Sequence, residues 1–300
     1  MITSDKKELF KKCYLCDSPD LKTFYKEKGI VKCSECNFIF FQPIPSSSEL
    51  DRVYSKYERE EYITENSIAK IQIELDGILR SYKISDVLDI ACGECYFLDI
   101  LKSIDPSLNL FATEHASAKE NVLKKGYQFI EGEFFPITDK KFDLIIFTEA
   151  IEHINDVNKF LKSAHTLLSP NGLIYLTTPN FSSIERLLMG SKWGMVVPPE
   201  HLSYFTPKTL KFAMNMNGFN EKFSKTENIS IYRIVEFWNK FYRKKQNKNL
   251  SNISAQKVSD NLQKIATSNL LLKFLKGIIN SLLNILGLGS SLKAMYQKNS

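Results

Sequence analysis

The stretch that decides the fold is Val87-Leu-Asp-Ile-Ala-Cys-Gly-Glu-Cys-Tyr-Phe-Leu98. Its first five residues form an apolar run of the length of a buried strand, and residues 96–104 show the periodicity of a helix. The small residues between them suit a tight turn, which lets the backbone approach a ligand. The stretch therefore predicts the first unit of a parallel α/β sheet, with a ligand at the carboxyl end of its strands.

The same alternation of strands and helices continues downstream. We expect strands at 110–113, 142–147 and 173–178, and helices at 116–125 and 156–168. This order predicts an α/β fold, a Rossmann-like and mostly parallel sheet flanked by helices, over residues 81–228. Glu114 follows the second strand, where an acid can accept hydrogen bonds from ribose hydroxyls. A dinucleotide would require G-x-G-x-x-G in the turn, and residues 91–95 read Ala-Cys-Gly-Glu-Cys, so dinucleotide binding is disfavoured.

All six cysteines occur in C-x-x-C pairs. The first two pairs are separated by 16 residues, a spacing typical of a zinc ribbon, in which two turns complete a tetrahedral four-sulfur site. Two disulfides are the alternative, but no secretory signal opens the sequence, and we expect a cytoplasmic protein. We therefore predict a small zinc ribbon at residues 1–45 with structural Zn²⁺, and a helical linker at 46–80. The expected zinc ligands are Cys13, Cys16, Cys33 and Cys36.

Several ordered motifs resemble those of class I S-adenosylmethionine-dependent methyltransferases. Residues 87–98 resemble their motif I, V-L-D-I-G-C-G-x-G-x-F-L, and residues 142–153 resemble the stretch F-D-x-x-x-x-x-E-V-L-E-H. Residues 168–180 resemble the L-K-P-G-G turn and the strand that follows it. The resemblance extends forward to residue 219 and back to the C-x-x-C-G-L-V-F-x-x-P lead-in of the ribbon. It implies S-adenosylmethionine as cofactor and transfer of its methyl group.

The resemblance also implies a set of cofactor-binding residues, with two departures from the motif. The first and last glycines of motif I are Ala91 and Cys95 here, and a positive φ at either position would cost about 1–2 kcal/mol. The acid that often contacts adenine is missing, and Glu133 is the nearest acid. Cys92 and Cys95 are expected to be small packed residues rather than a second metal site. The expected cofactor-binding residues are Asp89, Ala91, Cys92, Gly93, Cys95, Glu114, Glu133 and Glu149.

Two histidines are candidates for activating the acceptor. Methyl transfer is an in-line displacement, and a base is required only when the acceptor is protonated at neutral pH. His153 follows a strand at the ligand-binding edge, and His201 lies in a proline-rich loop that suits a lid. A structural histidine is the alternative for each. Glu149, Glu152 and His153 resemble a cluster that holds a divalent ion in ubiquinone-type O-methyltransferases, although acids at the start of a helix would look the same.

The C-terminal third differs in charge and pattern. Residues 211–300 hold 15 Lys and Arg against 4 Asp and Glu, which suits a phosphorylated substrate, an anionic lipid surface or RNA, or is merely a solvated face. Residues 229–300 predict an amphipathic helical insertion followed by the last strand. The helix at 264–288 suits packing on the sheet, a homodimer contact or peripheral membrane contact. The apolar stretch 277–292 is shorter than the roughly 20 residues of a membrane span.

These patterns together predict a methyltransferase that acts on a small-molecule acceptor. Relatives with this layout modify sugars and other small acceptors, so the resemblance implies a sugar or a phosphorylated or lipid-linked metabolite. One alternative is an RNA-modifying methyltransferase, although the Asn-Pro-Pro-Tyr signature of base-amine methylation is absent and nucleic acid is the less favoured partner. Another is a non-catalytic binding protein on a degraded methyltransferase fold, which the residues Ala91 and Cys95 would suit.

Overall fold

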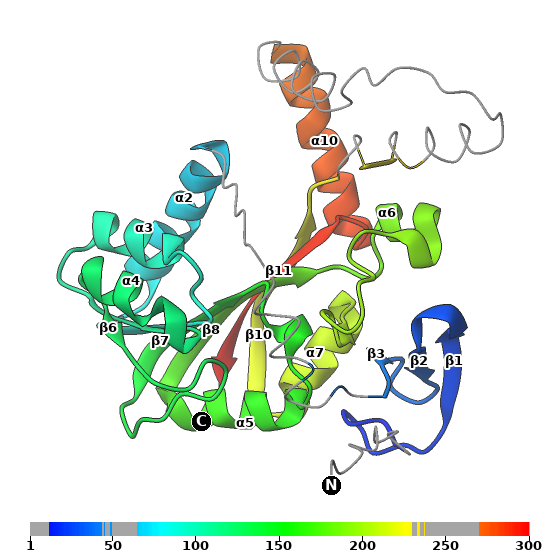
Figure 1. Cartoon of the computed structure of the whole chain (residues 1–300). Coiled ribbons are helices and arrows are strands. Elements are labelled where there is room, and N and C mark those ends of the chain that lie inside the picture. Colours follow the sequence, from blue (N-terminus) through cyan, green and yellow to red (C-terminus); the bar gives the residue numbers. More distant parts are fainter. Residues whose placement is uncertain are drawn as a thin grey trace, which may run out of the picture.

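The structure of the protein is a computed structural model that describes residues 12–43, 45, 49, 65–229, 233–234, 237 and 270–299. Within these residues the chain forms a seven-stranded sheet and a separate four-stranded sheet (Figure 1). The larger sheet carries helices on both faces, and the smaller one, drawn mostly in blue, lies at its side. The predicted α/β class is confirmed.

The seven-stranded sheet has the strand order β10-β11-β8-β7-β4-β5-β6. The five strands from β8 to β6 pair in parallel. Strand β11 is inserted antiparallel between β8 and β10, so β10 runs in the same direction as these five. The predicted parallel strands and the predicted last strand are all present, whereas β6 and β10 were not predicted. The strands are β4 (Asp86–Ile90), β5 (Asn109–Thr113), β6 (Gln128–Phe129), β7 (Phe142–Thr148), β8 (Leu168–Pro179), β10 (Phe219–Glu227) and β11 (Ser291–Lys298).

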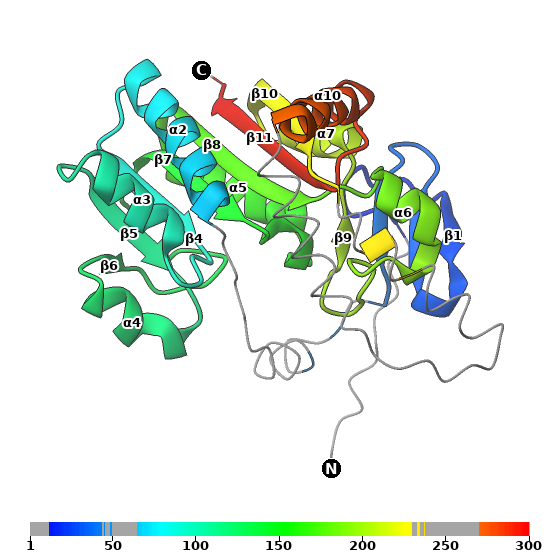
Figure 2. The same ribbon diagram turned by 90° about the horizontal axis from the view of Figure 1, so that it is seen from above.

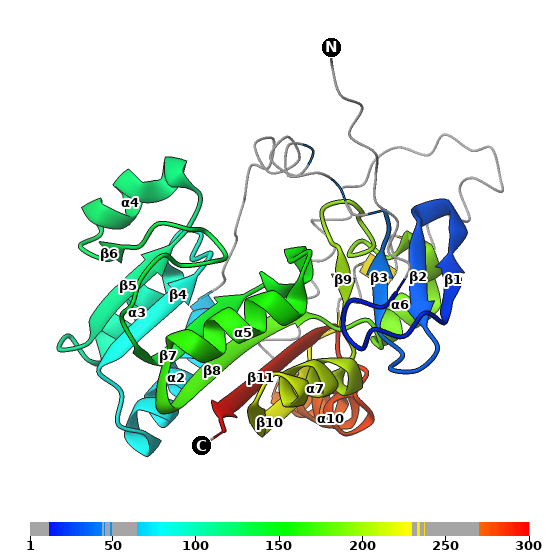
Figure 3. The same cartoon turned by 90° about the horizontal axis from the view of Figure 1, so that it is seen from below.

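Helices cover the two faces of this sheet and bury two separate cores (Figures 2 and 3). Along β7, Leu144 and Ile146 pack on one face, and Ile145 and Phe147 pack on the other, as the two-residue period of a strand requires. The first face is covered by α2 (Glu65–Ser81), α3 (Tyr96–Ile104) and α4 (Lys119–Lys124), and the second by α5 (Val157–Leu167) and α7 (Pro207–Met216).

Residues 65–80 of the predicted helical linker form most of helix α2, which packs into this core. Leu75 and Ile78 are buried against the sheet, and the Glu74 carboxylate pairs with Lys225 and Lys293 of the two antiparallel strands. The Lys293 Nζ lies 2.8 Å from Glu74 Oε2. The helix is therefore attached to the sheet by both apolar and charged contacts. Residues 46–48 and 50–64 lie outside the described residues.

The predicted C-terminal amphipathic helix corresponds to α10 (Leu270–Leu286), and residues 264–269 lie outside the described residues. Thr226 of β10 holds its end, donating its N–H to Asn284 Oδ1 at 2.9 Å and its hydroxyl to the Leu283 carbonyl at 3.0 Å. Leu283 is buried, whereas five large apolar residues are exposed: Ile278, Ile279, Leu282, Ile285 and Leu286. Among the described helices, none has the length and apolar character to cross a membrane.

The four-stranded sheet joins the N-terminal segment to a loop far along the chain. Its order is β1 (Leu21–Tyr25), β2 (Ile30–Cys33), β3 (Ile39–Phe41) and β9 (Ser203–Tyr204), and all pairs are antiparallel (Figure 3). Phe38 packs against Phe40 and Phe205 beneath it. The remaining elements are η1 (Lys26–Lys28), η2 (Ala116–Ala118), η3 (Ile151–His153), α6 (Ile184–Met189) and η4 (Gly190–Lys192).

Candidate functional site

The turn between β4 and α3, residues 91–95, has an unusual backbone. Ala91, Gly93 and Cys95 have φ values of 56°, 53° and 61°, all in the left-handed region. These are the three positions at which the resembled motif has glycine, which reaches this region without strain. The two non-glycine residues therefore carry the strain anticipated from the sequence, about 1–2 kcal/mol each.

Glu114 faces this turn from the end of β5, which pairs directly with β4. The Gly93 N–H donates to Glu114 Oε2 at 2.7 Å, and the His115 N–H donates to Oε1 at 3.1 Å. A carboxylate and the backbone of the turn thus lie together at the carboxyl edge of the sheet, where the sequence placed a ribose. Asp89 is buried at 2% exposure on β4 just before the turn.

Thr113, which was not predicted as a site residue, connects three of the expected positions. Its hydroxyl accepts the Ala91 N–H at 3.3 Å and donates to the Glu133 carbonyl at 2.6 Å. The Cys92 N–H donates to the Thr113 carbonyl at 3.0 Å. The hydroxyl of Thr113 therefore joins the loop that carries Glu133 to the turn. In the sequence, the position of Thr113 directly before Glu114 was the feature that could have identified it as a site residue.

The segment after β7 brings the two candidate histidines together. His153 lies at the end of η3, and its ring centroid is 4.9 Å from that of the buried His201, at an interplanar angle of 85°. Beside them, Glu152 is buried at 2% exposure and accepts a hydrogen bond from the Thr178 hydroxyl at 2.8 Å. Because β7 neighbours β4 in the sheet, this cluster and the turn lie at the same carboxyl edge.

Hydrogen bonds to backbone carbonyls decide the tautomer of both rings. His153 Nδ1 lies 2.9 Å from the Glu200 carbonyl oxygen, and His201 Nδ1 lies 2.9 Å from that of Met195. A carbonyl oxygen can only accept, so Nδ1 carries the proton in each neutral ring and Nε2 holds the lone pair. Burial lowers the pKa of His201 to about 4, which keeps its ring neutral at pH 7.

The residues that could bind a divalent ion differ from the expected set. The structure brings ligand atoms of Glu152, His153 and His201 within 4.8 Å of one another. The expected Glu149 is outside this group, because the chain turns through a left-handed conformation at Glu149 (φ 49°) and leaves its side chain exposed. His201 takes the place of Glu149 in the candidate set, and only folding brings His201 there.

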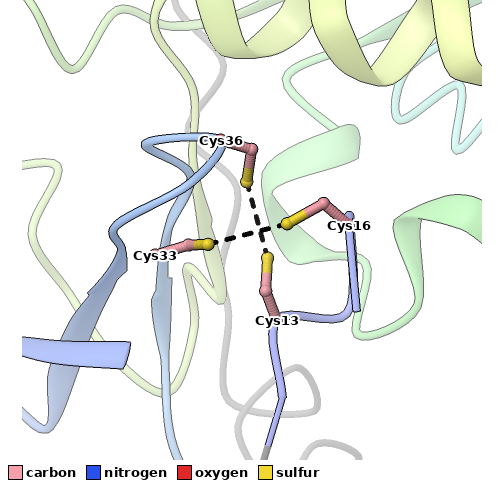
Figure 4. A group of neighbouring side chains, drawn as sticks. All are labelled: Cys13, Cys16, Cys33 and Cys36. Carbon is pink, nitrogen blue, oxygen red and sulfur yellow. Dashed lines mark hydrogen bonds between the residues drawn. The ribbon is translucent and has the colours of Figure 1, made fainter. Parts of the chain in front are cut away.

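The four ribbon cysteines converge on one point (Figure 4). Their sulfurs lie 3.6 Å apart in the pairs Cys13–Cys36 and Cys16–Cys33. A tetrahedral ion with metal–sulfur bonds of about 2.3 Å spaces its sulfurs by about 3.8 Å, whereas a disulfide requires about 2.05 Å. The geometry therefore fits one four-sulfur metal site and not two disulfides.

The ribbon also holds the loop that carries His201. The Phe41 N–H donates to the Leu202 carbonyl at 2.8 Å, and the Leu202 N–H donates to the Glu152 carbonyl at 2.8 Å. Next to them, the hydroxyls of Tyr14 and Ser203 lie 2.7 Å apart. The loop interpreted as a lid is thus a packed segment in this structure. The ribbon contacts Leu202 and Ser203 directly, and Leu202 in turn contacts Glu152.

Comparison with known proteins adds a family and several relatives. The model of a family described as "Methyltransferase domain" matches residues 58–221. A protein of Pelagibacter ubique named ubiquinone biosynthesis O-methyltransferase is 29% identical over 203 residues, which cover 59% of this chain and 83% of that protein. One of the same name from Azorhizobium caulinodans is 25% identical and covers 47% of this chain. The chain spans about half to three fifths of the length of that protein and further relatives.

Among solved structures, one similar chain is the plantazolicin methyltransferase BpumL in complex with a pentazolic desmethylPZN analog and SAH. The TM-score is 0.50 at 16% sequence identity, and the likeness covers 85% of this chain and 92% of the other. At this identity the likeness establishes the fold.

Proposed function

The chain belongs to the methyltransferase domain family and is an S-adenosylmethionine-dependent methyltransferase, and from this premise we propose that it methylates a hydroxyl group of a small-molecule acceptor. The pair of adjacent histidines beside the proposed cofactor edge carries this proposal. A hydroxyl is protonated at neutral pH, so its attack on a methyl group benefits from a base. The names of the O-methyltransferase relatives agree with an oxygen acceptor.

The residues of the turn fit S-adenosylmethionine. Glu114 would accept hydrogen bonds from the ribose hydroxyls, since its carboxylate already faces the Gly93 N–H at the edge where a nucleoside lies in this fold. Asp89, Cys92 and the strained positions beside it would border the methionine part. When bound, the cofactor supplies an electrophilic methyl group on a sulfonium. The protein's own contribution is to hold the acceptor oxygen in line with that group.

In this proposal His153 is the base, and His201 with Glu152 positions it. The lone pair on Nε2 of His153 would take the hydroxyl proton as the oxygen attacks. The neutral His201 ring packs edge-on against His153 and adds no positive charge to oppose the imidazolium that forms. The buried carboxylate of Glu152 would stabilise that imidazolium.

The same three side chains also fit a divalent ion, since one ring nitrogen of each histidine and one carboxylate oxygen lie within 4.8 Å of one another. A bound ion would lower the pKa of the acceptor hydroxyl. In this variant of the proposal His153 and His201 are ligands. Added Mg²⁺ or Mn²⁺ would then raise the activity of metal-depleted but zinc-replete protein, whereas an ion-independent rate would leave His153 as the base.

For the ribbon we propose a structural Zn²⁺ bound by the four cysteines. The sulfur geometry supports this, and so does the small size of the segment, which cannot form a stable core without a metal or another covalent link. By pairing β3 with β9, the ribbon would keep His201 and Glu152 in place. Its role is therefore to support the acceptor side of the site rather than to bind nucleic acid.

A lipid-linked or phosphorylated acceptor is supported by the C-terminal region. Helix α10 exposes an apolar face, including Ile285 at 79%, and its sequence contains two lysines and no acidic residue. Such a helix suits the interface of an anionic membrane. We expect the protein to sediment with phosphatidylglycerol vesicles at low salt and Leu282→Asp to weaken this. If the protein did not bind vesicles but formed a dimer that Leu282→Asp abolished, the apolar face would instead contact a second copy of the chain.

The cofactor part of the proposal is tested by Glu114→Gln. A hydrogen bond to a charged group contributes about 1.5–3 kcal/mol, so the variant should bind S-adenosylhomocysteine about 10- to 100-fold more weakly in isothermal titration. The matched control is Glu120→Gln on the exposed surface of α4, which should leave the Kd unchanged. Equal affinities for the two variants would remove Glu114 from the cofactor site.

A further inference from the structure

Two thiols lie side by side in the proposed cofactor turn. The sulfurs of Cys92 and Cys95 are 3.1 Å apart, and the Cys95 N–H donates to the Cys92 carbonyl at 2.8 Å, which closes the turn between them. Cys95 is fully buried and Cys92 is 8% exposed. Neither belongs to a cluster of three or more ligand groups among the described residues. A disulfide bond is about 2.05 Å long, so the sulfurs need to approach by only about 1 Å.

The surroundings favour a thiolate on Cys95. A hydrogen bond from the Cys92 thiol lowers the pKa of Cys95, and the ammonium group of Lys125 acts in the same direction. Lys125 is held near the turn, with its Nζ 2.5 Å from the Glu94 carbonyl oxygen and 2.8 Å from Asp99 Oδ2. Thiolates rather than thiols react with peroxides, and Cys95 would therefore react first, with Cys92 as its resolving partner.

We propose that Cys92 and Cys95 are a redox modification site, at which a peroxide-class oxidant forms a disulfide that weakens cofactor binding. The Cys95 thiolate attacks one peroxide oxygen, the O–O bond breaks, and one water leaves after protonation. The sulfenic acid at Cys95 is then attacked by the Cys92 sulfur, the S–S bond forms, and a second water leaves. In total two thiols lose two electrons and two protons, and one hydrogen peroxide becomes two waters.

The effect on the cofactor follows from the backbone of the turn, and this inference rests on the proposed S-adenosylmethionine site. Residues 91, 93 and 95 all have left-handed backbone conformations, and the Gly93 N–H donates to Glu114. The turn therefore cannot adjust to the shorter sulfur–sulfur distance without breaking these features. Closing the bond therefore shifts the backbone that would contact the cofactor. By thermodynamic reciprocity, bound cofactor must disfavour the disulfide by the same factor.

The test uses zinc-replete full-length protein and hydrogen peroxide. After quenching with N-ethylmaleimide, mass spectrometry should find residues 92 and 95 joined, at peroxide doses that leave the zinc content unchanged. Isothermal titration should then show a Kd for S-adenosylhomocysteine at least 10-fold higher than before oxidation, restored by dithiothreitol. Saturating S-adenosylhomocysteine should suppress the disulfide. The variant Cys95→Gly, which lacks the reactive thiolate, should show the same Kd before and after the peroxide treatment, whatever its starting Kd.

Two results would overturn this inference: no bond between residues 92 and 95 when the ribbon still holds zinc, or a disulfide that leaves the Kd unchanged. If the reduced protein bound no S-adenosylhomocysteine, the proposed cofactor site would fail together with this inference. If the reduced protein bound it and the oxidised protein bound it equally well, only this inference would fail.

Discussion

His153→Ala is expected to lower kcat by about 10²- to 10⁴-fold, the contribution typical of a general base, while the Kd for S-adenosylhomocysteine changes little. The variant removes the Nε2 lone pair at the acceptor side and leaves the turn at residues 91–95 and Glu114 untouched. The measurement is the rate of S-adenosylhomocysteine release with a hydroxyl acceptor found by screening, next to isothermal titration of the same preparation.

The pH profile distinguishes the two histidines as the base. Burial lowers the pKa of His201 to about 4, so His201 keeps its lone pair at any pH well above 4. A kcat that falls on acidification from pH 7 to 6 would therefore exclude His201 as the base. The matched control for His153→Ala is His165→Gln on α5, where the His165 ring packs on Phe219. This variant should keep the original kcat. A His153→Ala enzyme with more than half of the original kcat would contradict the proposed role.

Cys33→Ser should have the second large effect, because it removes one of the four sulfurs and with it the ribbon's metal. We expect loss of bound zinc, an earlier thermal transition and a kcat reduced at least 100-fold, since β9 would no longer be held beside His201 and Glu152. The Kd for S-adenosylhomocysteine should stay within about threefold, because the turn between β4 and α3 has no ribbon contact among the described hydrogen bonds. Zinc content, thermal unfolding and titration measure these effects.

The control for this variant is Glu35→Gln, which changes an exposed side chain on the same turn as Cys33 and Cys36 and should retain zinc and activity. If Cys33→Ser lost zinc but kept its kcat, the ribbon would not position the histidines. If it also lost S-adenosylhomocysteine binding, the ribbon would support the whole fold rather than the acceptor side.

The parts that the sequence predicts well are those in which neighbouring residues carry the signal. The apolar run at 87–91, the turn that follows it and the alternation through 178 suffice for the parallel sheet, because each strand is buried on both faces. The convergence of Cys13, Cys16, Cys33 and Cys36 on one point follows from the cysteine spacing alone. The motif also locates Ala91 and Cys95 as strained positions, since glycine is the residue that a left-handed turn accepts without cost.

What the sequence does not reveal depends on contacts between distant segments. His153 and His201 were separate candidates, and contacts between distant segments bring their ring centroids to 4.9 Å. These contacts include the bond from the Leu202 N–H to the Glu152 carbonyl and the pairing of β9 with β3. Strand β10 has a mostly polar sequence, which gives no strong strand signal until β11 is in place beside it. The candidate metal ligands differ from the predicted set for the same reason. Folding places His201, rather than Glu149, beside Glu152 and His153.

The central claim is that this chain binds S-adenosylmethionine in the turn at residues 91–95 despite Ala91 and Cys95. The most direct test is isothermal titration of reduced, zinc-replete protein with S-adenosylhomocysteine. We predict one site per chain with a Kd in the micromolar range, about −8 kcal/mol. The absence of binding up to millimolar concentration would contradict the claim.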